Sequence, residues 1–272
     1  MSPPPDLVTA DRTRGVLVGL AAGDRNGGPV RLAVRLAESL VEHGGFDRAD
    51  VARRYLAWWR SGAFDTGPVT ARALALLDGG APLDAVAAAV DAEMDGQTAG
   101  CNPAHRASVL AAAPLSDGQL ADAAVAEARL THAHPLAGDT SAAVVRCCRG
   151  LLRGLPWAAA LTFAADGRTP EVQRSLALVG GAPLGRGGFA PETLRAAVHF
   201  VAEAATFDEA LDGALAFAGP ANYCPVLTGA IAGARWGATA IAARHLGHCD
   251  ILARVRGAAE ALAQRWPRAA CP

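Results

Sequence analysis

Two histidines and an aspartate stand close together in the middle of the chain and could bind a metal ion. His132, His134 and Asp139 fall within eight residues, and imidazole and carboxylate groups are ligands that zinc accepts. Residues i and i+2 of a helix point apart, so the histidines could share a metal only from a loop and with further ligands. The alternative is a helix boundary, where a histidine binds the last carbonyls of one helix and Asp139 caps the next. The spacing favours the helix boundary.

A glycine-containing stretch over residues 96–102 has the composition of an anion-binding loop. Small polar residues beside Gly96 and Gly100 allow successive N–H groups to converge on a phosphate, and a following helix would direct its N-terminus to the same point. The stretch has no lysine and no strand before it, so it is neither a Walker loop nor a dinucleotide-binding turn. On spacing alone, an ordinary connecting loop is the simpler interpretation.

Two further segments look functional but have simpler interpretations. The glycine-rich residues 180–188 are not a Rossmann turn, and we expect them to form a flexible connection. His248, Cys249 and Asp250 resemble a catalytic set. Adjacent side chains do not face one another, so we assign no catalytic role to these three.

The chain of 272 residues contains no lysine, and all 25 of its Lys and Arg side chains are therefore arginine. This excludes Schiff-base chemistry, phosphate-loop lysines and the lysine–glutamate pair of protein kinases. A formal net charge of −1 leaves no basic surplus, so we expect no nucleic-acid-binding surface. Phosphate or carboxylate groups must therefore be held by arginine, by backbone N–H groups or by a metal.

The segments that must position these candidates have helical periodicity. Leu32, Leu36 and Leu40 recur four apart within residues 28–45, which begin with Gly-Pro and end with Gly-Gly. Further helices are expected over residues 50–60, 69–77, 83–94, 117–132, 139–154, 191–204, 207–219, 228–241 and 250–266. No sustained alternation of period two occurs, and only 5% of the residues are aromatic. The sequence therefore predicts an all-α protein.

We expect a single domain, with residues 1–13 as a flexible N-terminal tail and residues 14–272 as the folded unit. The first residues lack the apolar stretch of a secretory signal, and no apolar run reaches the roughly 18 residues of a membrane helix. The six cysteines show no CxxC spacing. We interpret them as reduced, mostly buried thiols in a cytoplasmic protein.

The order of these loops on a helical background resembles that of the ADP-ribosylglycohydrolase family. The matching strings are RTRGVLVGLAAGD, GPVTARALALL, the loop ending in NPAHR, LTHAHPLAG, and GFAPETLRAAVHFVAEAATFDEALDGALAF followed by TGAIAGARWG. The last is the most specific, because it is long and keeps its register. The resemblance extends from about Arg14 to Ile241. It implies a single-domain orthogonal helical bundle with a cleft for a ligand of the ADP-ribose type.

The resemblance also bears on metal binding, because the family's cleft typically holds two magnesium ions. Their ligands come from a Thr-Asp-Asp string at an early helix and from a Gly-Gly-Asp-x-Asp-Thr string before the GAIAG helix. Here the early string is missing from the short connection after Asp24, and Pro220, Asn222 and Tyr223 replace the late aspartates and threonine. Magnesium prefers anionic oxygen ligands. We therefore predict no metal-binding residue and no firm cofactor, although magnesium is usual in the family.

Carried onto the matching positions, the resemblance assigns roles around the cleft. Asp24 is the predicted catalytic carboxylate, and His132 or His105 would deliver a proton to the leaving group. Phosphates would rest on backbone N–H groups and arginine, and an aromatic ring would stack on a base. The predicted ligand-binding residues are Arg25, Asn26, Gly100, Cys101, Asn102, Arg106, His134, Phe189, Asn222 and Tyr223. Arg106 has an alternative interpretation as a structural ion-pair arginine.

Two functions are compatible with these residues. One is a hydrolase that cleaves a glycosidic bond to ADP-ribose or a related nucleotide with little or no dependence on magnesium. The other is a catalytically lapsed pseudoenzyme that binds ADP-ribose, another nucleotide or a protein partner. The expected partner is thus an ADP-ribose-like small molecule or an ADP-ribosylated substrate, and not a membrane. Turnover separates the two functions, and a purely structural role predicts neither turnover nor binding.

Overall fold

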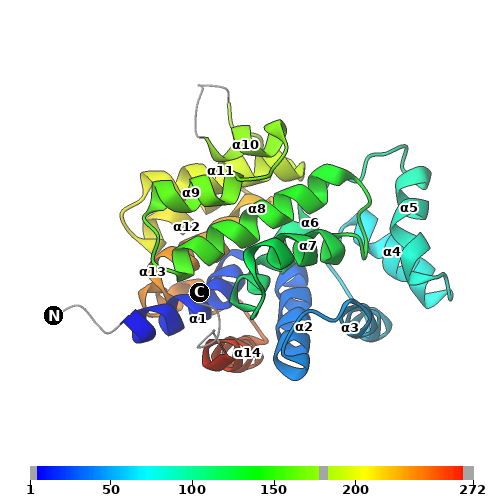
Figure 1. The fold of residues 1–272 in the computed structure, drawn as a ribbon, viewed down its shortest axis with the longest axis horizontal. Coiled ribbons are helices and arrows are strands. Elements are labelled where there is room, and N and C mark those ends of the chain that lie inside the picture. Colours follow the sequence, from blue (N-terminus) through cyan, green and yellow to red (C-terminus); the bar gives the residue numbers. More distant parts are fainter. Residues whose placement is uncertain (1–4, 178–182, 266–272) are drawn as a thin grey trace.

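The computed structural model describes residues 5–177 and 183–265, and the regular elements over these residues are all helices (Figure 1). The predicted all-α fold is therefore confirmed. In chain order the elements are α1 (Pro5–Gly23), α2 (Gly28–His43), α3 (Arg48–Arg60), α4 (Pro68–Asp78), α5 (Leu83–Glu93), α6 (Asn102–Ala107), η1 (Ser108–Ala112), α7 (Asp117–Ala128), α8 (Pro135–Leu152), α9 (Trp157–Ala165), α10 (Pro170–Leu176), α11 (Ala190–Glu203), α12 (Phe207–Ala218), α13 (Cys224–Trp236), η2 (Ala238–Ala240), η3 (Ala243–His245) and α14 (Leu252–Arg265). The flexible connection predicted over residues 180–188 lies partly outside the described residues.

Proline and glycine mark the ends of the helix that the sequence predicted over residues 28–45. α2 begins at Gly28 with Pro29 in its first turn, where the missing N–H of proline has no helical partner to lose. It ends before Gly44, whose left-handed backbone (φ 68°) lets its N–H reach the carbonyl of Leu40. Both ends are thus set by the residues that the sequence analysis used.

The N-terminal segment differs from the prediction. α1 begins at Pro5, so residues 5–13 of the predicted flexible tail are helical; residues 1–4 lie outside the described part. Asp11 accepts hydrogen bonds from the N–H and the hydroxyl of Thr239, at 3.2 and 2.8 Å. Arg12 donates to the carbonyl of Leu151 at 2.8 Å. Contacts with distant segments therefore hold this part of the chain in place.

α1 crosses α13 with their backbones in direct contact, and the two helices lie side by side in the left-hand part of Figure 1, α1 in blue and α13 in orange. A Cβ added to Gly15 would lie 2.1 Å from the carbonyl oxygen of Gly233, and one added to Gly19 would lie 2.1 Å from that of Gly229. Real Cβ atoms do not approach oxygen so closely. Only glycine at these positions lets the helices pack this tightly, in the way that small residues allow close helix crossings.

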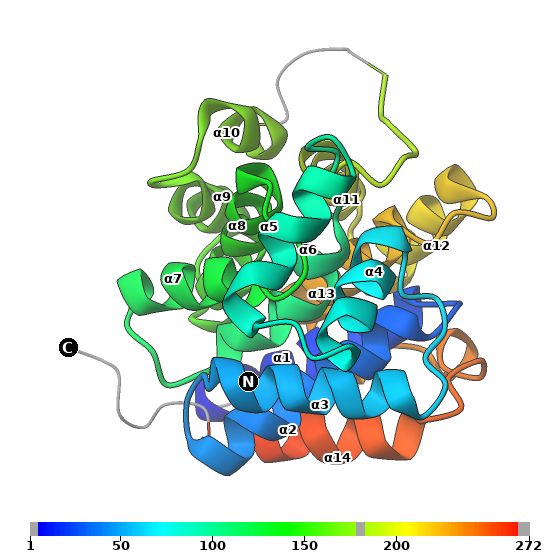
Figure 2. The same ribbon diagram turned by 90° about the vertical axis from the view of Figure 1, so that its right-hand side faces the viewer.

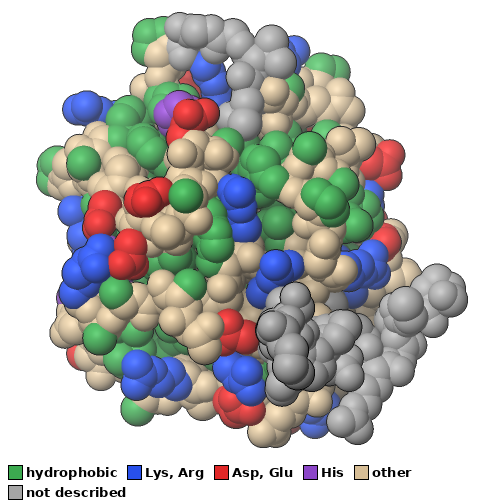
Figure 3. All heavy atoms as spheres, turned by 90° about the vertical axis from the view of Figure 1, so that its left-hand side faces the viewer, with side chains coloured by type: hydrophobic (Ala, Val, Ile, Leu, Met, Phe, Trp, Pro, Cys, Tyr) green, Lys and Arg blue, Asp and Glu red, His purple; other side chains and the backbone are tan. Residues whose placement is uncertain are grey.

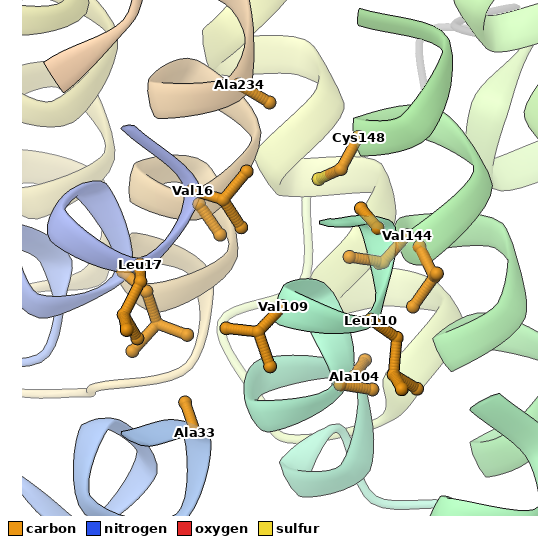
Figure 4. Packing of buried hydrophobic residues seen from close by; sticks show 14 of the residues in the cluster. Val16, Leu17, Ala33, Ala104, Val109, Leu110, Val144, Cys148 and Ala234 are labelled. Atoms are coloured by element: carbon orange, nitrogen blue, oxygen red, sulfur yellow. The ribbon is translucent and has the colours of Figure 1, made fainter. Parts of the chain in front are cut away.

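The main core lies between α1, α2, α6, η1, α8 and α13, and Figure 4 shows Val16, Leu110, Val144 and Ala234 pointing into it. Many of its members are alanine, which permits close packing of helices. α14 and α3 pack against α2 and form one side of the bundle (Figure 2). Four of the cysteines predicted to be buried thiols are buried and free, namely Cys101, Cys147, Cys148 and Cys224.

The surface carries both signs of charge. On the face in Figure 3, arginine and acidic side chains are interspersed with apolar ones. Ion pairs such as Arg14–Glu260 (2.6 Å) join neighbouring elements. Within the described residues, none of the helices combines the length and apolar character that crossing a bilayer requires.

Candidate functional site

A pocket of about 400 Å³ opens where five helices begin. Its walls come from the starts of α4, α6, α8, α11 and α13 and from the loop before α6. The lining residues are Gly67, Pro68, Val69, Gly96, Gln97, Ala99, Gly100, Cys101, Asn102, His132, His134, Gly188, Phe189 and Tyr223. The structure thus brings together seven of the predicted ligand-binding or catalytic positions from segments that are far apart in sequence, namely Gly100, Cys101, Asn102, His132, His134, Phe189 and Tyr223.

The helix starts give the pocket a positive potential without a charged side chain. α4, α8, α11 and α13 each carry proline in the first turn, at positions 68, 135, 191 and 225. The first N–H groups of a helix have no helical acceptor, and the macrodipole places partial positive charge there. None of the described lining residues is aspartate, glutamate or arginine. The helix dipoles therefore favour an anionic or polar ligand that is bound by hydrogen bonds rather than by ion pairs.

A short backbone pairing joins two walls of the pocket. Cys101 N–H donates to the carbonyl of Gly188 at 2.9 Å, and Ala190 N–H donates to the carbonyl of Ala99 at 2.9 Å. Gly100 and Phe189 face each other in an isolated antiparallel bridge. This corrects the prediction that Gly100, Cys101 and Asn102 together present their N–H groups to a phosphate, because the Cys101 N–H is already bound.

His132 lies in the wall of the pocket at the end of a buried hydrogen-bonded chain. Tyr55 Oη and Arg106 Nε donate to the same oxygen of Glu127, at 2.8 and 2.5 Å. Arg106 Nη2 donates to Thr131 Oγ1 at 2.9 Å, and Thr131 Oγ1 lies 2.7 Å from His132 Nδ1. Burial and the charge of Arg106 hold the pKa of His132 well below its usual range. The imidazole is therefore neutral at physiological pH and does not fit the predicted role of proton donor.

His105 and Arg106 point into the core, which corrects the roles predicted for both. His105 is buried, donates from Nε2 to the carbonyl of Tyr223 at 2.9 Å, and has its pKa lowered to about 4 by burial. Arg106 is fully buried and pairs with Glu127. Neither residue is in the pocket wall. The alternative interpretation of Arg106 as a structural ion-pair residue matches its position.

His134 and Asn102 line the pocket while also holding its walls together. His134 caps α8, because its Nδ1 accepts the N–H of Leu136 at 3.2 Å. Asn102 donates to the carbonyl of Thr66 at 2.7 Å. Gly67 (φ 72°) leaves room for this amide, since a Cβ there would lie 2.6 Å from Asn102 Nδ2. These contacts fix the starts of α4, α6 and α8 relative to one another.

A helix does begin within residues 132–139, at Pro135, but His134 caps it and Asp139 does not. Asp139 lies inside α8 and accepts hydrogen bonds from Arg168 at 2.9 Å and from the Thr169 hydroxyl at 2.7 Å. His132 and His134 make separate contacts, with Thr131 and Leu136. Within the described residues, no group of three histidine, cysteine or acidic side chains is arranged to hold a metal.

Phe189 and Tyr223 supply the exposed aromatic surface of the pocket. They are 37% and 40% exposed, whereas most aromatic side chains of the described chain are more deeply buried. A Cβ added to Gly188 would lie 3.1 Å from the ring of Tyr223, so the glycine lets the ring lie against the loop. Exposed aromatic rings at a pocket are suited to stacking on a planar base.

Asp24, the predicted catalytic carboxylate, lies outside this pocket and is used by the fold. It is 1% exposed, and its oxygens accept the N–H groups of Gly27 at 2.8 Å and Val30 at 2.7 Å. Asn222 Nδ2 donates to the same carboxylate at 2.7 Å. Asp24 therefore caps the start of α2 and ties it to the loop before α13.

Arg25 and Asn26 stand beside Asp24 and make contacts that are also structural. Arg25 donates to the carbonyls of Gly219 and Ala221 at 2.7 and 2.8 Å, and its backbone N–H donates to Asn222 Oδ1 at 3.1 Å. Asn26 donates to Asp65 at 3.2 Å. Arg25 and Asn26 line a second cavity of about 190 Å³ and not the larger pocket. The prediction that they bind the same ligand as the histidines is therefore not supported by their placement.

The residues at the expected magnesium position do not fit a metal ion. The Asn222 amide turns its nitrogen toward Asp24, and its oxygen accepts the Arg25 N–H, so both ends of the amide are used. Both oxygens of Asp24 accept N–H groups. A hard divalent cation needs free anionic oxygens at this point. Asp24 and Asn222 are therefore arranged to hold the fold together and not to bind a divalent cation.

Asp65 is a candidate catalytic carboxylate that was not among the residues predicted from the sequence. It is exposed and has a left-handed backbone (φ 50°), and its carboxylate accepts the Gly28 N–H at 3.3 Å. Desolvation is the main cause that raises the pKa of Asp65, and the nearby charge of Asp24 adds to it. Its neighbours Phe64 and Gly67 line the small and the large cavity respectively. The Asp-Thr-Gly-Pro turn at residues 65–68, directly before a helix, was the available signal.

Comparisons with known proteins agree with one another. A family model described as ADP-ribosylglycohydrolase matches residues 30–270. A solved structure described as "ADP-ribosylglycohydrolase-related protein complex" is similar to this chain with a TM-score of 0.78 and 27% sequence identity. The alignment covers 95% of this chain and 99% of that one. No curated protein matches the sequence.

Proposed function

The chain belongs to the ADP-ribosylglycohydrolase family, and on this premise we propose that its 400 Å³ pocket binds ADP-ribose or a related nucleotide without cleaving it. The family and the fold indicate an ADP-ribosylglycohydrolase-like function. Three features of the pocket support a nucleotide ligand: the helix starts, the buried His132, and the exposed rings of Phe189 and Tyr223.

The lining of the pocket supports the proposal that the protein no longer cleaves a glycosidic bond. No carboxylate is among the described residues that line the pocket, whereas glycosidic hydrolysis canonically uses carboxylates as acid, base or nucleophile. Asp24 is occupied as a helix cap, and the pKa values of His105 and His132 are too low for either ring to carry a transferable proton at neutral pH. A bound ligand would therefore meet hydrogen-bond donors but no reacting group.

A second candidate function, residual hydrolysis, is favoured by Asp65. This carboxylate is exposed, its pKa is raised, and it stands two residues before Gly67 in the pocket wall. A carboxylate with a raised pKa can act as a general acid or base nearer to neutral pH. In this version the protein is a slow hydrolase whose reacting group is Asp65 rather than Asp24.

The experiment combines calorimetry with a product assay on the same preparation. ADP-ribose is titrated into the protein, and ADP-ribosylated arginine and serine peptides are incubated with it, each with and without magnesium. Binding with no released ADP-ribose supports the first candidate. Release that is lost in Asp65→Asn but kept in Asp95→Asn supports the second, since Asp95 is the other described non-glycine residue with positive φ. Absence of both binding and release contradicts the proposed function.

A further inference from the structure

The ring proton of His132 can be placed from the hydrogen bonds of Thr131. The guanidinium of Arg106 can only donate, so Thr131 Oγ1 accepts from it at 2.9 Å. The hydroxyl has one hydrogen, and His132 Nδ1, at 2.7 Å, is its only other partner among the described residues. If Nδ1 were protonated, the hydroxyl hydrogen of a fully buried residue would have no acceptor. Thr131 therefore donates to an unprotonated Nδ1, and the ring proton lies on Nε2.

Nε2 is the atom that the pocket presents to a ligand. A Cβ added to Gly100 would lie 3.2 Å from His132 Nε2, so the nitrogen faces the glycine in the opposite wall. His132 is only 2% exposed, and Nε2 has no hydrogen-bond partner among the described residues. Nε2 is not among the unpaired polar atoms that are fully closed off from solvent, so it stays open to the pocket, where a ligand or water can accept its hydrogen.

We propose that the chain Tyr55–Glu127–Arg106–Thr131 fixes His132 as a neutral donor whose Nε2–H binds an oxygen of the pocket's ligand. The inference rests on the proposed function, because it takes that ligand to be a nucleotide of the ADP-ribose type. Thr131 and Arg106 are positioning residues, since they act on the ligand only through the imidazole.

The ionisable groups around His132 agree with a neutral ring. Those joined to it through hydrogen bonds are Arg106 on α6, Glu127 on α7 and Tyr55 on α3, and His134 lines the same pocket from the start of α8. Glu127 pairs with Arg106, and the described residues provide no hydrogen bond or ion pair from a carboxylate to the ring. Burial beside a guanidinium therefore disfavours the imidazolium ion.

The expected acceptor is a phosphate oxygen. The starts of α4, α8, α11 and α13 border the same pocket and add partial positive charge to the single Nε2–H donor. An anionic oxygen gains more from this field than a ribose hydroxyl does. AMP and ADP-ribose should therefore make the contact, and adenosine should lack it.

The first test reads the tautomer directly and needs no ligand. The protein is labelled with ¹⁵N-histidine, and the two ring nitrogens of His132 are assigned at neutral pH by comparison with His132→Gln. The expected result is a protonated Nε2 and an unprotonated Nδ1. Protonation of Nδ1, or of both nitrogens, would overturn the proposal.

The second test measures affinity for ADP-ribose, AMP and adenosine in matched variants. Thr131→Val removes the hydroxyl at nearly constant shape, and one lost hydrogen bond should weaken ADP-ribose and AMP binding about 3- to 10-fold. Thr131→Ser should retain binding, as should Thr140→Val, which removes a buried hydroxyl that has no partner within the described parts of the chain. His132→Leu should weaken AMP binding but leave adenosine binding unchanged. The folded state of each variant is checked by its melting temperature.

The two tests separate failure of this inference from failure of the proposed function. Unchanged affinity in folded Thr131→Val and His132→Leu would overturn the role of His132 as a ligand donor while the nucleotide function stood. If the wild type bound none of the three probes, the proposed function and the donor role would both fail. The tautomer would still be decided by the nitrogen resonances.

Discussion

Asp24 is the residue whose role changes most between sequence and structure. Its carboxylate accepts two N–H groups at the start of α2 and the amide of Asn222, and the side chain is buried. Such charge-assisted hydrogen bonds are stronger than neutral ones, and their loss leaves buried donors without partners. The residue should therefore contribute mainly to stability.

Asp24→Ala is expected to lower the free energy of unfolding by about 2–4 kcal/mol, because a helix cap and a buried interhelical bond are lost together. Urea denaturation followed by circular dichroism measures the change. The matched control is Asp47→Ala. Asp47 caps α3 by accepting the Asp50 N–H, and its loss should lower the free energy of unfolding by only about 1 kcal/mol. Equal effects in the two variants would show that the contacts of Asp24 with α2 and Asn222 add nothing.

Buried histidines should make stability depend on pH. His105 titrates near 6.5 when unfolded but only near 4 when folded, because burial disfavours its charged form. Between these values the unfolded state binds the extra proton, so stability is greatest above pH 6.5 and falls as the pH drops toward 4. His132, whose folded pKa is also lowered, acts in the same direction.

His105→Gln tests this dependence, because glutamine keeps a donor for the Tyr223 carbonyl but does not titrate. The wild type should lose about 2 kcal/mol more than the variant between pH 7 and pH 5. Denaturant midpoints at the two pH values give the difference. Parallel pH profiles would mean that His105 is not held neutral in the folded protein.

Side-chain direction explains why some site residues could be predicted and others could not. Seven predicted positions do line one pocket, because the loops that carry them precede helices that converge. Arg106 and His105 belong to the same matched string, yet α6 turns them into the core. A one-dimensional motif gives the spacing of residues but not the face of a six-residue helix on which each one falls.

Among the elements, the crossing of α1 and α13 depends most closely on residue type. Each helix contributes glycines four residues apart, and the added Cβ distances of about 2 Å show that no larger residue fits without moving a backbone. The helices themselves were predictable from proline, glycine and periodicity. The close crossing was not, because it depends on which faces of two distant helices meet.

Gly19→Ala should lower the free energy of unfolding by about 3 kcal/mol or more, because the new methyl group collides with the backbone of α13. Gly257→Ala is the control: at this exposed position in α14 no atom of residues 5–177 or 183–265 lies within 4 Å of an added Cβ, so alanine should stabilise by about 0.5–1 kcal/mol. Thermal and denaturant unfolding of both variants measure the contrast. A mild effect of Gly19→Ala would mean that the two helices can separate freely.

At the scale of the whole molecule, the pocket joins five helix starts between Gly67 and Tyr223. A ligand that contacts several of these segments binds the folded state and not the unfolded chain. It should therefore raise the melting temperature by linkage, with about 2.7 kcal/mol of stabilisation at a hundredfold excess over Kd.

ADP-ribose should raise the melting temperature by the same amount with magnesium and with a chelator, because the Asp24 and Asn222 oxygens are taken by N–H groups. A thermal-shift titration in both buffers measures this. Buffer alone and free ribose serve as controls. A shift that required magnesium would show that the Asp24–Asn222 contacts open to admit a cation.

The crossing of α1 and α13 also affects how the chain folds during synthesis. Gly15 and Gly233 touch although more than 200 residues separate them, and contacts of such long range form late and slow folding. At ribosomal rates the partner helix is made roughly 10 to 40 seconds after α1. During that interval the face of α1 that carries Gly15 and Gly19 has no partner helix. Chaperone binding and association between nascent chains should therefore concentrate on α1.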